Sequence, residues 1–251
     1  MMWSFGALCD EFYVNSRLYF KLELDPSRDS LLHFFEQIRR AFPRLSRLRR
    51  RDDGTLLLEE EEEPDGEGRY YVRLDANALK FGCHSPSDAE QVDRLAKVVL
   101  TQAPYQLSLS DLDYDYMEVV YTFDLEYRGN HDELVAETLF ADHPLMTTLV
   151  GEEQRVIDCQ PFLGVTLTPD CEKQLYMEIK GRTSSHEVRS GDYEPAPLSV
   201  YVTVRRYWNR GGPAELPKAH HELVALGEQI AAERVVPHVI QPLAAAIASR
   251  R

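Results

Sequence analysis

The sequence predicts an α+β fold made of two similar halves, each with a strand, a helix, four strands and a helix in that order. Two observations support this prediction. Apolar residues switch between strand-like and helical spacing along the chain, with turn residues between the segments. The same order of segments then recurs, with no long Gly/Ser/Pro linker between the two parts. We expect residues 1–108 and 109–251 to be two α+β repeats packed as one unit, with antiparallel sheets and helices on one side.

The first half begins with a strand at 12–24, rich in aromatic and aliphatic residues. Asp25-Pro26 is a cap followed by proline, and an apolar helix face then runs from Leu31 to Phe42 until Pro43 ends it. Two hairpins follow, and Ser85-Pro86-Ser87-Asp88 predicts a capping box for a second helix that Pro104 ends. The hairpins pair 45–51 with 55–62 and 69–75 with 78–83.

The second half begins with a strand at 116–127, and Asn130 then caps a helix. A last helix is predicted from about 216 to 236, where Pro237 interrupts it before a short alanine-rich helix. Four strands are expected between these helices, at 155–159, 162–168, 174–182 and 198–208.

The two halves also share some sequence. LYFKLELDPSRDSLL at 18–32 and YTFDLEYRGNHDELV at 121–135 have five identities in fifteen positions without a gap. A strand-helix-four-strand-helix unit that occurs twice resembles the duplicated fold of the TATA-box-binding proteins, which implies a curved antiparallel sheet with helices on one side. The DNA-binding role is not implied, because this chain is acidic and has no phenylalanine wedge pairs. A duplicated ferredoxin-like arrangement is the alternative fold.

The composition disfavours some functions and locations. The chain has 42 acidic and 28 basic residues, a formal charge of −14, which repels nucleic acid and anionic lipid. The four scattered cysteines have no metal-binding spacing and indicate free thiols in a reducing compartment. We find no convincing signal peptide and no apolar stretch of membrane-spanning length, so we predict a cytoplasmic protein without membrane contact.

One hairpin carries opposite charges on its two strands. Seven arginines precede the turn at Asp53-Gly54 and seven acids follow it. A two-residue turn there would place Arg47 opposite Glu60 and Arg44 opposite Glu63, so that the hairpin neutralises itself. In the alternative, the arginines contact an acidic surface or a phosphate. Of the cluster, Arg39 and Arg40 lie on the helix and are the most available to bind. The arginines are 39, 40, 44, 47, 49, 50 and 51, and the acids are 59–63, 65 and 67.

Catalytic and metal-binding signatures are missing from the sequence. It has no GxGxxG, GxxxxGK[ST], HExxH or GxSxG. His131 and His143 fall at opposite ends of one predicted helix, and the His220-His221 pair lacks ligands one helical turn away. The acidic run at 111–116 lacks the glycine and the glutamate of a calcium loop. No metal site and no cofactor are expected, and the catalytic residues of any activity stay unknown.

The last predicted strand ends in basic and aromatic residues. Arg205, Tyr207 and Trp208 could stack on a ligand and pair with it, so we place a binding surface there first. Our leading hypothesis is a non-catalytic module that binds a protein partner or a small molecule, and a homo-oligomer is one form such a module takes. The alternatives are an enzyme whose site lies between the two halves and nucleic-acid binding through the arginines at 39–51.

Overall fold

One antiparallel sheet of nine strands is the centre of the molecule. The computed structural model describes residues 5–61, 69–151, 153–208, 213 and 215–250. The strand order is β2-β3-β4-β5-β1-β6-β9-β8-β7, so the strands of both parts of the chain form a single sheet. The strands are β1 (Glu11–Phe20), β2 (Arg47–Arg50), β3 (Leu56–Glu59), β4 (Arg69–Leu74), β5 (Ala78–His84), β6 (Tyr114–Tyr127), β7 (Phe162–Thr166), β8 (Lys173–Lys180) and β9 (Ala196–Tyr207).

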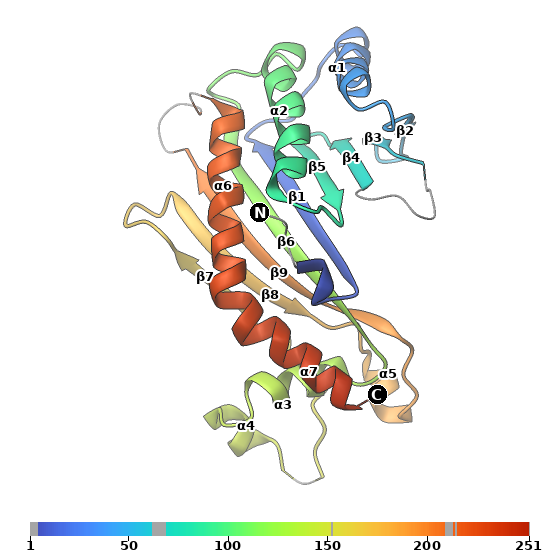
Figure 1. Cartoon of the computed structure of the whole chain (residues 1–251), viewed down its shortest axis with the longest axis vertical. Coiled ribbons are helices and arrows are strands. Elements are labelled where there is room, and N and C mark those ends of the chain that lie inside the picture. Colours follow the sequence, from blue (N-terminus) through green and yellow to red (C-terminus); the bar gives the residue numbers. More distant parts are fainter. Residues whose placement is uncertain (1–4, 62–68, 152, 209–212, 214, 251) are drawn as a thin grey trace.

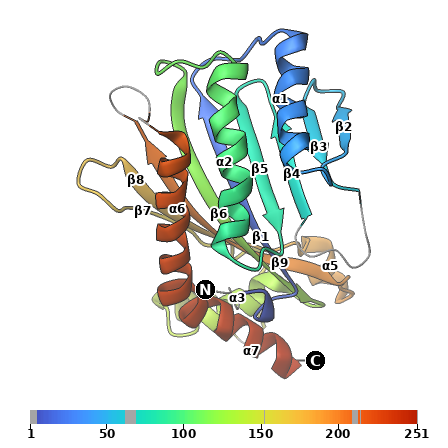
Figure 2. The ribbon, with the colours of Figure 1, turned by 45° about the horizontal axis from the view of Figure 1, so that its top comes forward.

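The helices lie on one side of this sheet. Figures 1 and 2 show α1, α2 and α6 side by side over one face, and the chain ends in α7 below them. No helix in the described part of the chain is long and apolar enough to cross a bilayer. The helical segments are η1 (Phe5–Ala7), α1 (Arg28–Ala41), α2 (Ala89–Gln106), α3 (His131–Leu139), α4 (Pro144–Leu149), α5 (Ser185–Ser190), α6 (Leu216–Ile230), the π-helical η2 (Ala231–Ile240) and α7 (Gln241–Arg250).

Alternation along the strands separates the two faces of the sheet. In β1, every second residue from Phe12 to Phe20 is buried beneath the helices, whereas the residues between them are partly exposed. β6 pairs with β1 so that Ser16 lies opposite Val119 and Arg17 opposite Glu118. The sheet therefore has an apolar face under the helices and an open face that carries polar and aromatic side chains.

The prediction of four strands in the second half is wrong. Residues 155–159 form no strand, because their backbone groups bond to side chains at the start of α3. The Asn130 side chain donates to the Val156 carbonyl, and the Cys159 amide donates to Asp132 Oδ1 at 2.7 Å. Asn130 also caps α3, as the sequence predicted.

The predicted register of the charged hairpin is wrong by one residue. Arg47 lies opposite Glu59, not Glu60. The loop has three residues, Asp52 to Gly54, with Gly54 at φ +86°, and the Arg51 amide donates to the Thr55 carbonyl. Glu62, Glu63, Asp65 and Glu67 lie outside the described residues. The change of register places the side chains of Arg47 and Arg49 on the open face.

Four helix boundaries also differ from the predictions. Ser27 caps α1 in place of Asp25, and Asp88 caps α2 in place of Ser85. Pro104 lies within the last turn of α2, which continues to Gln106. Pro237 does not break the C-terminal helix, because η2 has the wider π-helical turn, which accommodates a residue without an amide hydrogen.

Candidate functional site

Three basic side chains lie directly opposite one another on the open face. β4, β5 and β1 are neighbours, and their register pairs Arg73 with Lys80 and Lys80 with Arg17. Like charges that face each other across strands destabilise a sheet. The row therefore needs counter-charges, and places where like charges are held together are often functional sites.

This row forms the floor of a concavity of about 860 Å³. Among the described residues, seven basic side chains and two carboxylates line it, a formal excess of five positive charges there in a chain of net charge −14. The basic residues come from four strands and one turn, and those of β2 and its turn lie at the exposed rim. The lining comprises Tyr13, Asn15, Arg17, Arg47, Arg49, Arg51, Leu57, Glu59, Glu60, Arg69, Tyr70, Tyr71, Arg73, Lys80 and His84. We call this concavity the basic basin.

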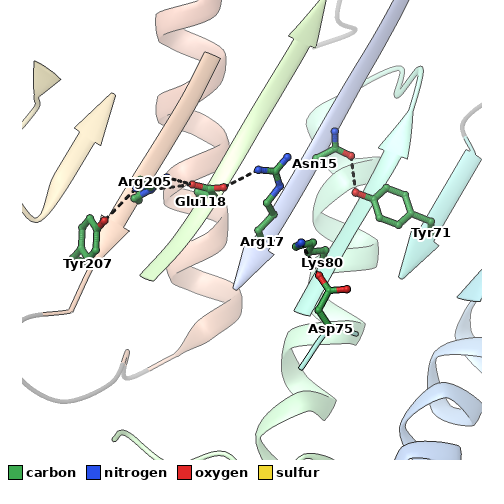
Figure 3. A network of polar contacts seen from close by, with 8 residues as sticks. All are labelled: Asn15, Arg17, Tyr71, Asp75, Lys80, Glu118, Arg205 and Tyr207. Carbon is green, nitrogen blue, oxygen red and sulfur yellow. Dashed lines mark hydrogen bonds and ion pairs between the residues drawn. The ribbon is translucent and has the colours of Figure 1, made fainter. Parts of the chain in front are cut away.

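Two carboxylates pair with the cations of the row, and Figure 3 shows Asp75 beside Lys80 and Glu118 beside Arg17. Asp75 accepts from Arg73 Nε and from Lys80 Nζ, each at 2.6 Å. Burial alone would raise the pKa of Asp75, but the two cations outweigh it and lower that pKa. At the other end, Arg17 donates to Glu118 at 3.0 Å.

Glu118 is nearly inaccessible and bridges two arginines. Its second oxygen accepts from Arg205 of β9 at 2.7 and 2.9 Å. Burial opposes the charged form of Arg17 and Arg205, yet Glu118 outweighs it and raises the pKa of both guanidinium groups. Both therefore remain cations at any physiological pH.

Gly82 leaves room for the Tyr71 side chain to lie across β5 at the floor of the basin. Tyr71, Gly82 and Asn15 lie in one row, and the Tyr71 hydroxyl donates to Asn15 Oδ1 at 2.8 Å, across β5. A Cβ on Gly82 would come within 2.8 Å of the Tyr71 ring and of the Val14 carbonyl oxygen. Burial raises the pKa of Tyr71 to about 12, so the phenol stays a neutral donor.

The structure separates the residues that the sequence analysis chose for binding. Arg205 and Tyr207 lie on the open face, where Arg205 donates to the Tyr207 hydroxyl at 3.1 Å and stacks on the Tyr116 ring at 4.3 Å. Trp208 points to the helical side and packs near Tyr114, with ring centroids 6.1 Å apart.

The arginine cluster at 39–51 is divided between the two sides of the sheet. Arg39 and Arg40 are exposed on α1, Arg40 pairs with Glu36, and neither lines the basin. Arg44 pairs with Glu60 at 3.5 Å, and Arg49 pairs with Glu59. Within the described ranges Arg47 and Arg51 form no ion pair, so the predicted self-neutralisation does not extend to them there.

Sequence reasoning missed Arg17, Arg69, Arg73 and Lys80. Part of the signal was present, because tyrosine, asparagine or arginine occupies every second position of 13–19 and 69–73. That alternation predicts a solvent-exposed face of a strand, but it does not predict the order of the strands in the sheet. The meeting of β4, β5 and β1 could not be read from it.

A second group of titratable residues lies where β1 meets β6. Glu11 is opposite Asp124, His84 Nε2 lies 3.9 Å from Glu11, and the Tyr13 hydroxyl donates to Glu11. Burial raises the pKa of Asp124, whereas burial and the charge of Arg69 lower the pKa of His84. Tyr13 and His84 also line the basin, so this group adjoins it.

A Ser-His-Asp arrangement exists in the core. Ser16 Oγ lies 2.7 Å from His220 Nε2, and His220 Nδ1 lies 3.4 Å from Asp93 Oδ1. Ser16 and His220 are 1% and 0% exposed, and neither lines the basic basin. A nucleophile that no substrate reaches cannot act, so we assign this group a structural role between β1, α2 and α6.

Comparison with known proteins gives no further assignment. No protein-family model matches the chain, and no curated protein sequence is significantly similar to it. Among the described residues, no three His, Cys, Asp or Glu side chains gather in a group that could hold a metal ion. The assignment of a function therefore depends on the geometry of the open face.

Replacing Glu118 tests whether the bridge between the arginines stabilises the fold. We expect Glu118→Gln to lower the free energy of unfolding by about 2–3 kcal/mol, below the range for a fully buried pair because both arginines are partly exposed. Urea denaturation measures this change. The matched control is Glu178→Gln on β8, a partly exposed carboxylate on the same face, for which we expect less than about 0.5 kcal/mol. Equal losses in the two variants would contradict the role of the bridge.

The buried histidine predicts acid sensitivity. Burial lowers the pKa of His220 below its ordinary 6.5, although Asp93 opposes this effect. The unfolded chain therefore binds a proton near pH 6.5 that the folded chain does not bind. The free energy of unfolding falls as the pH drops from about 7.5 through 6.5 toward the folded pKa.

We expect His220→Gln to reduce this pH slope by up to about 1.4 kcal/mol per pH unit, the value for one proton. The measurement is the free energy of unfolding at several pH values, and the slope is compared, so a uniform loss of stability does not affect the result. The exposed His33→Gln is the control and should keep the wild-type slope. An unchanged slope in His220→Gln would refute the assignment.

Proposed function

We propose that this chain is a non-catalytic cytoplasmic module that binds a small anionic molecule in the basic basin. The ligand class is a compact molecule with several phosphate or carboxylate groups. The observation that carries the proposal is the row Arg73, Lys80 and Arg17, three cations in direct register at the floor of a concavity.

Electrostatics favours an anion at this place. Asp75 is shared by Arg73 and Lys80, and Glu118 is shared by Arg17 and Arg205. Two carboxylates therefore face four cations, and an excess of positive charge remains along the row. An anionic group above Lys80 would relieve the repulsion between the three strands and would receive charge-assisted hydrogen bonds. Arg47 and Arg51 at the exposed rim can close on a second anionic group without breaking an ion pair in the described part of the chain.

The size of the basin suits a small molecule. A volume of about 860 Å³ falls within the range of about 300–1,000 Å³ that is usual for ligand pockets. Tyrosine hydroxyls and the Asn15 side chain add polar groups that can orient a ligand. Most of the lining is charged, which favours a highly polar ligand over an apolar one.

An origin of the chain by duplication belongs to the same proposal. β1 and β6 begin 103 residues apart, the offset of the aligned segments 18–32 and 121–135. The first strand of each part pairs with the last strand of the same part, β1 with β5 and β6 with β9. These features support two repeats that meet at the β1–β6 pair, with one strand fewer in the second.

A binding measurement with tripolyphosphate as the probe tests the proposed ligand class. We expect calorimetric binding to the wild type that weakens at high salt, because exposed charges are screened. Arg47→Gln/Arg51→Gln should weaken binding by about tenfold or more, from the loss of two charge-assisted contacts. Both side chains are exposed, so the variant should keep the wild-type stability.

The control is Arg39→Gln/Arg40→Gln, which removes the same charge from the helical side and should bind like the wild type. Equal weakening in both double variants would mean that net charge alone attracts the probe. A single-stranded oligonucleotide that binds more tightly than tripolyphosphate through Arg47 and Arg51 would favour the nucleic-acid alternative.

A second candidate is an enzyme that acts on the bound anion. Glu11, His84 and Asp124 come from both parts of the chain, and the pKa values of His84 and Asp124 are shifted. Such groups beside a basic pocket can transfer protons. Turnover of a phosphate or carboxylate ester that His84→Gln abolishes, while tripolyphosphate binding persists, would favour the enzyme over the binding module.

A further inference from the structure

The two edges of the sheet differ sharply in charge. β2 at one edge has the sequence RLRR, and β7 at the other has FLGVT. Charge-free sequence extends around β7 from residue 159 to residue 169. Edge strands are usually protected by charges, prolines or covering segments, because their free backbone groups can pair with another chain. β2 has such charges and β7 does not.

The side chains of β7 are uncovered on both faces of the sheet. Phe162, Leu163 and Val165 are 64%, 58% and 42% exposed. Phe162 stacks on Tyr176 of β8 on the open face, whereas Leu163 and Val165 lie on the opposite face. Apolar side chains on an unprotected edge are typical of a contact surface.

The register with β8 shows which backbone groups of β7 point outward. The Ile179 amide donates to the Pro161 carbonyl, and the Leu167 amide donates to the Lys173 carbonyl. In an antiparallel pair, hydrogen-bonded positions alternate, so residues 161, 163, 165 and 167 direct their groups toward β8. Phe162, Gly164 and Thr166 therefore direct their N–H and C=O groups away from the sheet, and β7 is the terminal strand of the described sheet.

We propose that two copies of this chain pair through β7, antiparallel about a two-fold axis at Gly164. This register places Phe162 opposite Thr166 of the second copy and Gly164 opposite its own equivalent, so every outward backbone group of β7 gains a partner. Leu163 of each copy then lies opposite Val165 of the other, at the closely spaced positions of the pair. The two nine-stranded sheets become one sheet of eighteen strands.

The charge distribution favours a second copy as the occupant. Two chains of −14 repel each other over most of their surfaces, and a charge-free edge is where they approach at the least cost. A two-fold contact requires a strand that is complementary to itself. The strand FLGVT meets this requirement when it pairs antiparallel about its central glycine. The contact is independent of the basic basin, whose described lining contains no residue of β7.

Size-exclusion chromatography with light scattering tests this pairing on the full chain. We expect the wild type to move from 28.9 kDa to twice that mass as its concentration rises. Leu163→Lys/Val165→Lys should remain at the one-copy mass, because it places four like charges together across the contact. Circular dichroism must show that this variant keeps the wild-type fold, as expected for exposed positions.

Two further samples make the result specific. Leu22→Lys/Leu112→Lys adds the same charge at side chains 69% and 81% exposed elsewhere, and should dimerise like the wild type. An equimolar mixture of the Lys/Lys variant with Leu163→Glu/Val165→Glu should recover the two-copy mass, because each lysine faces a glutamate. Three results would each overturn the proposal. The wild type could stay at the one-copy mass at every concentration, the Lys/Lys variant could form a dimer, or the mixture could fail to recover the two-copy mass.

Discussion

The antiparallel pairing of β1 with β6 is the constraint on which the rest of the structure depends. These strands lie at the middle of the sheet and join the strands of residues 11–84 to those of residues 114–207. Their register sets Arg17 opposite Glu118, and the pairing of β6 with β9 then sets Glu118 opposite Arg205. A slip of one residue would turn each side chain of β1 to the other face, so Phe12 and Leu18 would leave the core as Arg17 entered it. The apolar core and the polar row are thus fixed by the same register.

The basic basin acts as a unit although the chain as a whole is acidic. Neighbouring strands lie about 4.8 Å apart, within the Debye length of about 8 Å at physiological salt, so Arg73, Lys80 and Arg17 add to one local field. Net charge therefore describes how the protein repels large polyanions at a distance, and it does not describe the potential inside the basin.

The sequence predicted the α+β class, the hairpin of β4 and β5, and most helices, because these depend on local spacing. The sequence-based predictions failed where contacts between residues distant in the chain determine the structure. The segment 155–159 has strand-like residues, yet Asn130 and Asp132 take its backbone groups. The hairpin register depended on one residue of loop length, which changed the partner of Arg47 from Glu60 to Glu59.

None of the five residues chosen for binding lines the basin, and only the arginine run at 39–51 contributes to it, for the same reason. Arg205 and Tyr207 were chosen from one strand end, and they do lie on the open face. The basin itself combines residues of β1, β2, β4 and β5, and only the strand order brings them together. No window of the sequence contains Arg17 beside Lys80. An arginine-rich run was the visible feature, but its charge is divided between α1 and the open face.

Strand geometry also determines how two basins would relate in a pair of copies joined at β7. β5, near the middle of the basin, is five strands from β7, so eleven strand steps separate the two β5 strands. At about 4.8 Å a step the separation along the sheet is roughly 50 Å. Neighbouring strands are rotated by about 20° each, and eleven steps accumulate roughly 220°. The two basins would face nearly opposite directions and could not close on one ligand. Each copy would therefore bind its ligand independently. Pairing through the apolar edge would then control assembly without changing the affinity of the basin.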